Sequence, residues 1–252
     1  MKIFAFANQK GGVGKTTTVQ NLGMGLKNLG KKVLLIDLDA QGNLSDSYGI
    51  DLNNLENTIY DVFKGKKELN NVIHEQQGLS IVPSNLELSG ADIEFSSIPG
   101  REFLLKDALE EVSDYDIVLI DCPPNLGLMT LNALSAADTI YIPLQTEYYS
   151  MKGMAQLLDC IKLIKKRINS KLNFGGVICT MFDHRKNLNR EVKELIDDYF
   201  EGKVLETVIR ENISLAEAPS KSMTIFDYKP ASNGAEDYLK LTQEILEREE
   251  IK

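Results

Sequence analysis

Short, continuous runs of apolar residues alternate along this chain with stretches that repeat apolar residues at helical spacing. The runs are rich in Val and Ile and lie at residues 3–7, 33–37, 79–83, 116–121, 139–143, 174–181 and 204–209. Helical spacing marks the stretches 16–29, 102–112, 151–168 and 188–200. Runs that are apolar without alternation are typical of parallel strands buried on both faces. The pattern therefore predicts an α/β fold, with a mostly parallel twisted sheet covered by helices on both faces.

Length and composition favour one globular domain. The 252 residues contain no linker or repeat, so we expect residues 1–252 to share one core. Hydrophobic residues at 43% and charged residues at 26% are ordinary for such a domain. No apolar run is long enough to cross a bilayer, and the first begins beside Met1 without the pattern of a signal peptide. We expect a cytoplasmic protein.

The net charge limits how this chain can contact nucleic acid or membrane. Against 37 Asp and Glu there are only 28 Lys and Arg, which gives a formal charge of -9. Such a surface repels DNA and anionic lipid over most of its area. Any DNA binding would therefore need a local basic patch.

The cysteines and histidines predict no metal site. Cys122, Cys160 and Cys179 lack the close pairing that metal ligation and redox cycling use, and we expect all three to be core thiols. His74 and His184 each stand alone and are predicted to be surface residues.

A glycine-rich segment, KGGVGKTT at residues 10–17, lies between the first apolar run and the first helical stretch. Its glycines let the backbone turn tightly and aim N–H groups inward, and the following helix presents its positive end to an anion. Phosphate is the natural ligand of such a loop. Lys15 is expected to reach the terminal phosphates and the Thr16 hydroxyl to bind Mg²⁺.

The segment departs from the usual phosphate-loop pattern in an informative way. That pattern has glycine at the position of Gln9, and here a second lysine, Lys10, directly precedes the glycines. A dinucleotide-binding fingerprint fits less well, because a GxGxxG motif begun at Gly12 would end on Thr17.

The additional lysine is the signature of the deviant Walker A ATPases, and the chain resembles the ParA or Soj partition ATPases of that family. The resemblance extends over nearly the whole chain, through ANQKGGVGKTTT from Ala7, VLLIDLDAQGN from Val33, SNLELSGADIE from Ser84, IDCPPNLGLMTLNAL from Ile120 and LAEAPS from Leu215. It implies a P-loop NTPase that binds ATP and Mg²⁺. It also implies that Lys10 crosses a dimer interface to the nucleotide of a partner subunit.

The resemblance assigns roles within the loop and after the second apolar run. It implies that Lys10, Lys15 and Asp39 are catalytic, with Asp39 the hydrolysis residue. The expected nucleotide-binding residues are Lys10, Gly11, Gly12, Val13, Gly14, Lys15, Thr16 and Thr17.

Acidic residues follow two of the apolar runs, where open α/β sheets place their ligands. Asp37 and Asp39 are two residues apart and, on an extended chain, would point the same way, one toward Mg²⁺ through water and one toward the attacking water. Asp121 closes the run 116–121 in the arrangement of a Walker B carboxylate. Thr16, Asp37, Asp39 and Asp121 are therefore the predicted magnesium contributors. The loop from Pro123 to Gly127 is predicted to sense the terminal phosphate, with a rigid turn after a strand as the alternative.

Adenine and DNA contacts are predicted from the later part of the chain. Met181, Phe182 and Pro219 lie where relatives surround adenine, and ordinary packing explains them equally well. Sequence-independent DNA contact is expected at six basic residues in the region that relatives use, Arg185, Lys186, Arg190, Lys203, Arg210 and Lys221, with an ordinary solvated surface as the alternative.

The resemblance implies a functional cycle with two partners. An ATP-bound homodimer would hold nonspecific DNA at the nucleoid, and a ParB-like centromere-binding protein would stimulate hydrolysis through a basic N-terminal segment. No helix-turn-helix segment is seen before the first run, so operator-specific repression is not expected.

Two other functions remain open at this point. A MinD-like ATPase would share the phosphate loop but dock on membrane through a basic amphipathic C-terminal helix, whereas glutamates crowd the tail EDYLKLTQEILEREEIK and anionic lipid would repel them. We expect that tail to pack on the sheet, and no membrane contact. A non-enzymatic ATP-gated module or a nitrogenase-type iron protein is the third possibility, and its iron version would need paired cysteines.

Overall fold

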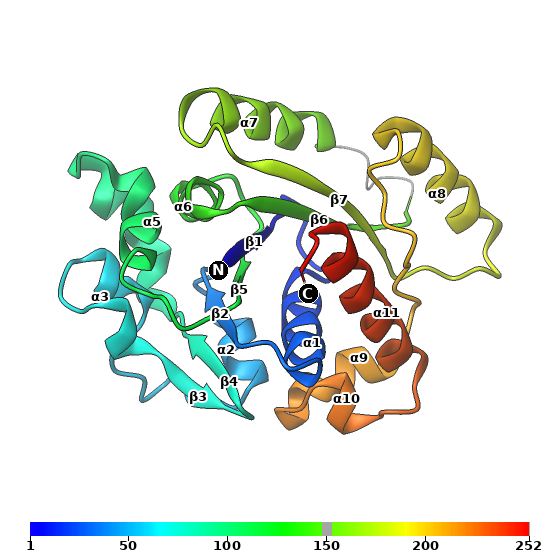
Figure 1. Ribbon diagram of the computed structural model, residues 1–252, viewed down its shortest axis with the longest axis horizontal. Coiled ribbons are helices and arrows are strands. Elements are labelled where there is room, and N and C mark those ends of the chain that lie inside the picture. The colour runs from blue at the N-terminus through cyan, green and yellow to red at the C-terminus, as the bar shows by residue number, and fades with distance from the viewer. Residues whose placement is uncertain (148–152, 252) are drawn as a thin grey trace.

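The computed structural model describes residues 1–147 and 153–251 and contains one sheet of seven strands. The strands are β1 (Lys2–Phe6), β2 (Val33–Asp37), β3 (His74–Gln76), β4 (Leu79–Val82), β5 (Ile117–Asp121), β6 (Thr139–Gln145) and β7 (Asn173–Thr180). They lie in the order β3-β4-β2-β5-β1-β6-β7, and every neighbouring pair is parallel except β3 with β4. The predicted α/β fold with a mostly parallel sheet is confirmed (Figure 1).

Helices cover both faces of the sheet. They are α1 (Lys15–Asn28), α2 (Asn43–Ser47), α3 (Ile59–Phe63), α4 (Ala91–Glu94), α5 (Leu104–Leu109), α6 (Leu128–Ala136), α7 (Met154–Arg167), α8 (Asn187–Phe200), α9 (Ile213–Glu217), α10 (Ile225–Tyr228) and α11 (Asn233–Arg248). Short 3₁₀ turns occupy Leu69–Val72, Leu86–Gly90, Phe95–Ser97, Arg101–Phe103 and Ala218–Lys221.

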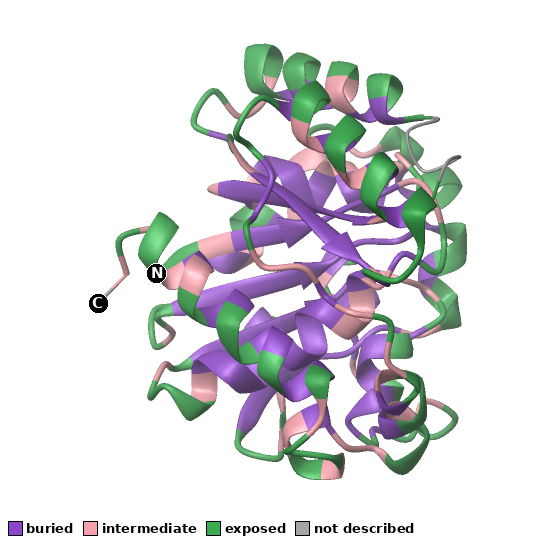
Figure 2. Ribbon diagram, turned by 90° about the vertical axis from the view of Figure 1, so that its right-hand side faces the viewer, coloured by how far each residue is buried: buried purple, intermediate pink, exposed green. Residues whose placement is uncertain are grey.

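Two hydrophobic clusters, one on each face, hold the layers together. One joins alternate strand residues such as Ala5 and Ile120 to helices α3 and α5 to α8, and the other joins Phe4 and Leu119 to α1, α2, α10 and α11. Successive residues of a strand point to opposite faces, so every central strand contributes to both clusters. Figure 2 shows the strands buried between helices whose outer sides are exposed.

One predicted strand is wrong, and one strand was not foreseen. Residues 204–209 form no continuous strand, only an isolated bridge from Val204 to Val177 and single hydrogen bonds to β7, such as that from the Ile209 N–H to the Cys179 carbonyl at 2.8 Å. Between these contacts, the N–H groups of Glu206 and Thr207 donate to the Glu244 carboxylate, each at 2.8 Å. The missed strand, β3, has the polar sequence HEQ and lies at the antiparallel edge, so it carries no apolar signal.

The predicted helices occur with shifted bounds. The stretch 102–112 contains a 3₁₀ turn followed by the shorter α5, and residues 151–152 of the stretch 151–168 lie outside the described residues. The C-terminal tail forms a helix as expected, α11, whose buried residues Tyr238, Leu241 and Ile245 lie in one cluster with strand residues and whose main neighbour is α1. The expectation of three core thiols is wrong for Cys160, which is only partly buried, whereas Cys122 and Cys179 are buried.

Candidate functional site

The glycine-rich loop lies where β1 ends and α1 begins, at the carboxyl edge of the sheet. Gly12 and Gly14 adopt φ values of 72° and 85°, a left-handed region that side-chain-bearing residues rarely enter, which explains glycine at both positions. α1 has no side-chain cap at its N-terminus, so its first N–H groups are free to face an anion. The loop therefore has the backbone of an anion-binding site.

Three polar side chains that the sequence analysis did not single out brace this loop. Asn8 accepts from the Lys10 N–H at 3.0 Å and donates to the Pro143 carbonyl at 2.8 Å. Gln145 donates to the Gly12 carbonyl at 3.2 Å, and Thr180 donates to the Val13 carbonyl at 2.9 Å. Gln145 and Thr180 end the adjacent strands β6 and β7. Their place at the ends of two predicted strands is the sequence signal from which their contact with the loop could have been predicted.

Lys15 lies inside the loop. Its side chain is buried, and its ammonium group donates to the Lys10 carbonyl at 3.2 Å. Burial lowers the pKa of Lys15, while the negative charges of Asp121 and Asp39 oppose that shift. A buried ammonium group with one backbone acceptor is available to a phosphate that enters the loop.

Lys10 lies outside the loop. Its ammonium group contacts Gln145 Oε1 at 2.7 Å and Glu147 Oε2 at 2.9 Å, and its side chain is 38% exposed. The two lysines of the segment thus have different surroundings, since Lys15 is buried within the loop and Lys10 lies at the surface beside Glu147.

Thr16 and Asp121 form the centre of the predicted metal site. The Thr16 hydroxyl donates to Asp121 Oδ2 at 2.6 Å, and the buried Asp121 Oδ1 has no partner among the described residues. Burial, together with the nearby charge of Asp37, raises the pKa of Asp121. An unpartnered buried carboxylate oxygen beside a hydroxyl suits a cation or its bound water.

No cluster of three or more metal-ligating side chains occurs in residues 1–147 and 153–251. Mg²⁺ is commonly held by one or two protein groups together with substrate phosphates and waters, so a sparse protein donor set fits this ion.

Asp37 and Asp39 have different environments. Asp37 ends β2 directly opposite Asp121 on β5 and is fully buried, and its oxygens accept from Ser45 Oγ at 2.8 Å, from the Ser45 N–H and from the Asp39 N–H. Burial raises the pKa of Asp37 to about 6. Asp39 lies beyond the end of the strand, half-buried, and accepts from the Gln41 N–H at 3.0 Å. The predicted strand 33–37 is therefore confirmed with Asp37 at its end, and Asp39 lies beyond it.

A cavity of about 110 Å³ lies beside Gly14 and Thr17, and its remaining lining comes from residues near the ends of β7 and α9 and from α11. Met181 lines this cavity and has a φ of 52°, an unusual conformation for a residue with a side chain. Phe182 lies instead against a separate hollow with Arg185 and Glu211, and Pro219 belongs to the turn after α9. Of the three predicted adenine contacts, Met181 is the one placed at the cavity beside the loop.

The six basic residues predicted for DNA contact fall into two groups. Three are paired with carboxylates, since Arg185 binds Asp183, Lys186 binds Glu211 and Arg210 binds both Asp237 and Glu236. Among the described residues, no carboxylate pairs with the other three, Arg190, Lys203 and Lys221.

Comparison with known proteins agrees with this geometry. Residues 1–174 match a family model described as an AAA domain. The chain is 46% identical to the sporulation initiation inhibitor protein Soj of Bacillus subtilis, over 97% of this chain and 98% of the relative. It is 44% identical to the chromosome-partitioning ATPase Soj of Treponema pallidum, over 98% of each chain. Among solved structures, cobyrinic acid a,c-diamide synthase from Mycobacterium smegmatis with bound ATP analog and magnesium has a TM-score of 0.89 and 34% identity, covering 100% of this chain and 96% of that one.

Proposed function

Because this chain belongs to the ParA and Soj family of partition ATPases, we propose that it hydrolyses ATP slowly and partitions DNA as an ATP-bound dimer. The observation that carries the proposal is the separation of the two loop lysines. Lys15 is buried at the loop, whereas the Lys10 ammonium group lies outside it and is partly exposed. A phosphate in the loop would be served by Lys15 of its own chain, which leaves Lys10 for a nucleotide on a second chain.

The residues of the loop would bind ATP through its phosphates. Free N–H groups at the start of α1, the turn through Gly12 and Gly14, and the Lys15 ammonium group all provide positive charge for the phosphate oxygens. The cavity that Met181 lines lies beside Gly14 and is our candidate for the adenine, and contacts from Phe182 and Pro219 remain predictions.

Thr16 and Asp121 would hold Mg²⁺, the hydroxyl directly and the carboxylate through water. When bound, the ion would neutralise charge on the phosphate oxygens. Asp37 fixes the turn that carries Asp39 by accepting the Asp39 N–H, so we assign Asp37 a positioning role within the predicted metal site.

Asp39 would orient the attacking water. Its half-buried carboxylate follows β2 at the same sheet edge as the loop. Since phosphoryl transfer depends mainly on positioning and on charge neutralisation, Lys10, Lys15 and Asp39 together with Mg²⁺ would be sufficient for slow turnover. A ParB-like partner would accelerate hydrolysis, in line with the family resemblance.

DNA contact would use the cations that no carboxylate neutralises. Arg190, Lys203 and Lys221 meet this condition among the described residues, whereas Arg185, Lys186 and Arg210 have acidic partners. A dimer would double the number of these cations, and binding to phosphates alone would place the protein on the nucleoid without sequence preference.

A MinD-like membrane role is the alternative, and the packing of α11 argues against it. Its apolar residues Tyr238, Leu241 and Ile245 are buried against the rest of the chain, so they are not free to enter a bilayer interface. No helix in the described part of the chain is long and apolar enough to span a membrane.

Co-sedimentation separates these functions. The protein, incubated with ATP and Mg²⁺, is centrifuged in parallel with plasmid DNA and with anionic liposomes, and ADP replaces ATP in a control. We expect ATP-dependent sedimentation with DNA, weakening steeply as salt rises. Sedimentation with liposomes alone would establish the membrane role instead.

A further inference from the structure

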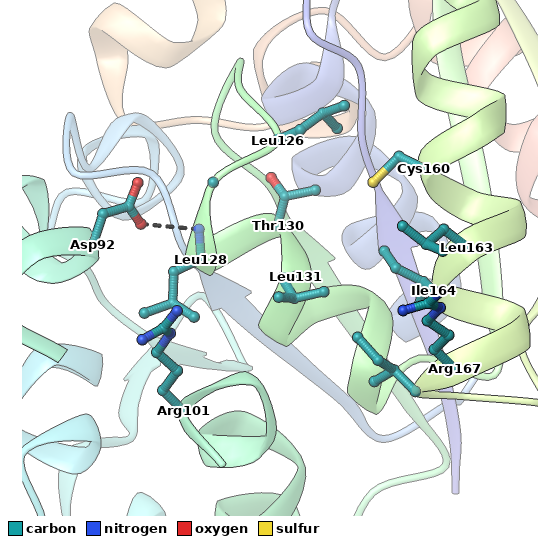
Figure 3. Close-up of a pocket in the computed structure, with 12 residues that line it drawn as sticks. Asp92, Arg101, Leu126, Leu128, Thr130, Leu131, Cys160, Leu163, Ile164 and Arg167 are labelled. Carbon is teal, nitrogen blue, oxygen red and sulfur yellow. Dashed lines mark hydrogen bonds between the residues drawn. The ribbon is translucent and has the colours of Figure 1, made fainter. Parts of the chain in front are cut away.

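Outside the nucleotide site, a hollow lies between α6 and α7. Its volume is about 440 Å³, compared with about 110 Å³ for the cavity beside Gly14. Leucine and isoleucine are half of its twelve lining residues, namely Leu126, Leu128, Leu131, Leu163, Ile164 and Ile168. Figure 3 shows how all of these except Ile168 lie around the hollow. Leu163 is 52% exposed, so an apolar wall of this groove faces solvent.

Two guanidinium groups flank the groove and lack acidic partners. Arg101 donates to the Ser96 carbonyl, and neither Arg101 nor Arg167 forms an ion pair within the part of the chain that the structure describes. The remaining charged residue of the lining is Asp92, whose Oδ1 accepts from the Leu128 N–H at 2.9 Å. On a chain with a formal charge of -9, this groove is therefore apolar with a local excess of positive charge.

We propose that the groove binds an acidic amphipathic helix of a partner protein. The wall from Cys160 to Ile168 is two helical turns long, about 12 Å at about 1.5 Å per residue. That length suits a segment that inserts apolar residues at i, i+3, i+4 and i+7 between two helices. Carboxylates beside those residues would pair with Arg101 and Arg167, because guanidinium groups bind carboxylates in a bidentate geometry.

The groove also touches the loop that follows Asp121. Gly127 and Leu128 form part of its wall, and the Asp92 carboxylate packs so closely there that a Cβ on Gly127 would lie 2.7 Å from it. A bound segment would therefore contact the end of the loop that begins at the metal-site carboxylate. Occupancy of the groove should then change the rate of ATP hydrolysis, a consequence that rests on the proposed function.

The test uses two designed peptides and fluorescence anisotropy with the full chain. One fluorescein-labelled 16-residue helical peptide carries leucine at i, i+3, i+4 and i+7 with flanking glutamates, and its matched control carries lysines in place of the glutamates. We expect saturable binding of the glutamate peptide only. The double variant Arg101→Gln and Arg167→Gln should weaken binding at least tenfold, and so should Leu163→Gln. Lys162→Gln, on α7 but outside the lining, should leave the affinity unchanged.

Several outcomes would overturn this inference. Equal binding of both peptides, or no binding of either peptide, would contradict it. So would unchanged affinity in the arginine double variant when its circular dichroism spectrum is native. Binding of laurate but not of the peptide would show that the groove takes a lipid-like ligand instead. ATP turnover of the unliganded protein is measured in parallel. ATP turnover without peptide binding refutes only the proposal that the groove binds a helix. Peptide binding without ATP turnover refutes the proposed ATPase cycle but supports the proposal for the groove.

Discussion

The Thr16 hydroxyl donates a hydrogen bond of 2.6 Å to Asp121 Oδ2 and so connects the start of α1 to the end of β5. The two residues are 105 positions apart in the sequence, and their contact depends on the parallel pairing of β1 with β5. Because Asp121 Oδ1 remains buried without a partner among the described residues, the pair has one oxygen available for a magnesium-bound water.

Thr16→Val tests this pair. Removing the hydroxyl should weaken magnesium-dependent ATP binding by about 10–100-fold, the usual effect of losing a group that supports a metal site. It should also lower stability by about 1–3 kcal/mol, since buried Asp121 loses its donor. Isothermal titration with ATP in Mg²⁺ and in EDTA measures the first effect, and the EDTA affinity is the internal control. Equal losses under both conditions would contradict a metal role.

Lys10→Ala should retain ATP binding but lose ATP-dependent dimerisation and DNA binding, because the ammonium group meant for the second nucleotide is gone. Glu147→Gln should have the opposite effect. It releases Lys10 from an exposed ion pair worth about 0.2–1 kcal/mol in each of the two chains, so the dimer should form at about 2- to 30-fold lower concentration. Sedimentation velocity with ATP measures both variants. A stable ATP-bound dimer of Lys10→Ala would remove the basis of the proposed function.

Asp39→Ala should trap the ATP-bound dimer. Loss of the residue that orients water should slow single-turnover hydrolysis by about 100-fold or more while leaving ATP affinity nearly unchanged. Quench-flow measurement with radiolabelled ATP gives the rate, and Asp46→Ala, in α2, provides a nearby acidic control. Hydrolysis at the wild-type rate would exclude Asp39 from the reaction.

The predicted DNA contacts are tested by comparing basic residues that form an ion pair with a carboxylate and basic residues that do not. Arg190→Glu combined with Lys221→Glu should abolish DNA retention at low salt, since no carboxylate neutralises either residue in the described structure. Arg185→Gln should have a smaller effect because its guanidinium group already binds Asp183 through two contacts of 2.9 Å. Gel-shift affinity over a salt series measures both, with ATP turnover as the control. An equal loss of DNA affinity in the Arg185 variant would show that the ion pair with Asp183 does not reduce the contribution of Arg185 to DNA binding.

The central strands were predictable from the sequence, and the peripheral elements were less so. Strands such as β2 and β5 are buried at every residue, so each gives a continuous apolar run. β3 has the polar sequence HEQ, and its pairing depends on an edge that no local pattern indicates. The turn of the glycine-rich loop between β1 and α1 was predictable because glycine spacing and flanking elements are local features of the chain.

The electrostatic state of individual side chains was not predictable. The sequence predicts Arg210 as a cation available to DNA. In the structure it binds Asp237, 27 residues away, through contacts that the packing of α11 creates. Asp37 and Asp39 look equivalent in the sequence, yet the end of β2 buries the first and leaves the second half-exposed. Such differences arise from tertiary contacts between distant segments.

The burial of Asp37 gives the nucleotide-free protein a specific pH dependence. Its pKa is raised from 3.8 to about 6, so between these values the folded state holds a proton that the unfolded state has released. This contribution to the unfolding free energy is complete below pH 4 and is lost as pH rises through 6, at up to about 1.4 kcal/mol per pH unit. Asp37→Asn cannot lose a proton, so its stability relative to wild type should rise by about 2 kcal/mol from pH 4 to pH 7. Urea unfolding at several pH values measures this difference, with Asp198→Asn on the exposed side of α8 as the control. A stability difference that stays constant with pH would show that Asp37 is ionised throughout this range, and that the hydrogen bonds from Ser45 and Asp39 outweigh its burial.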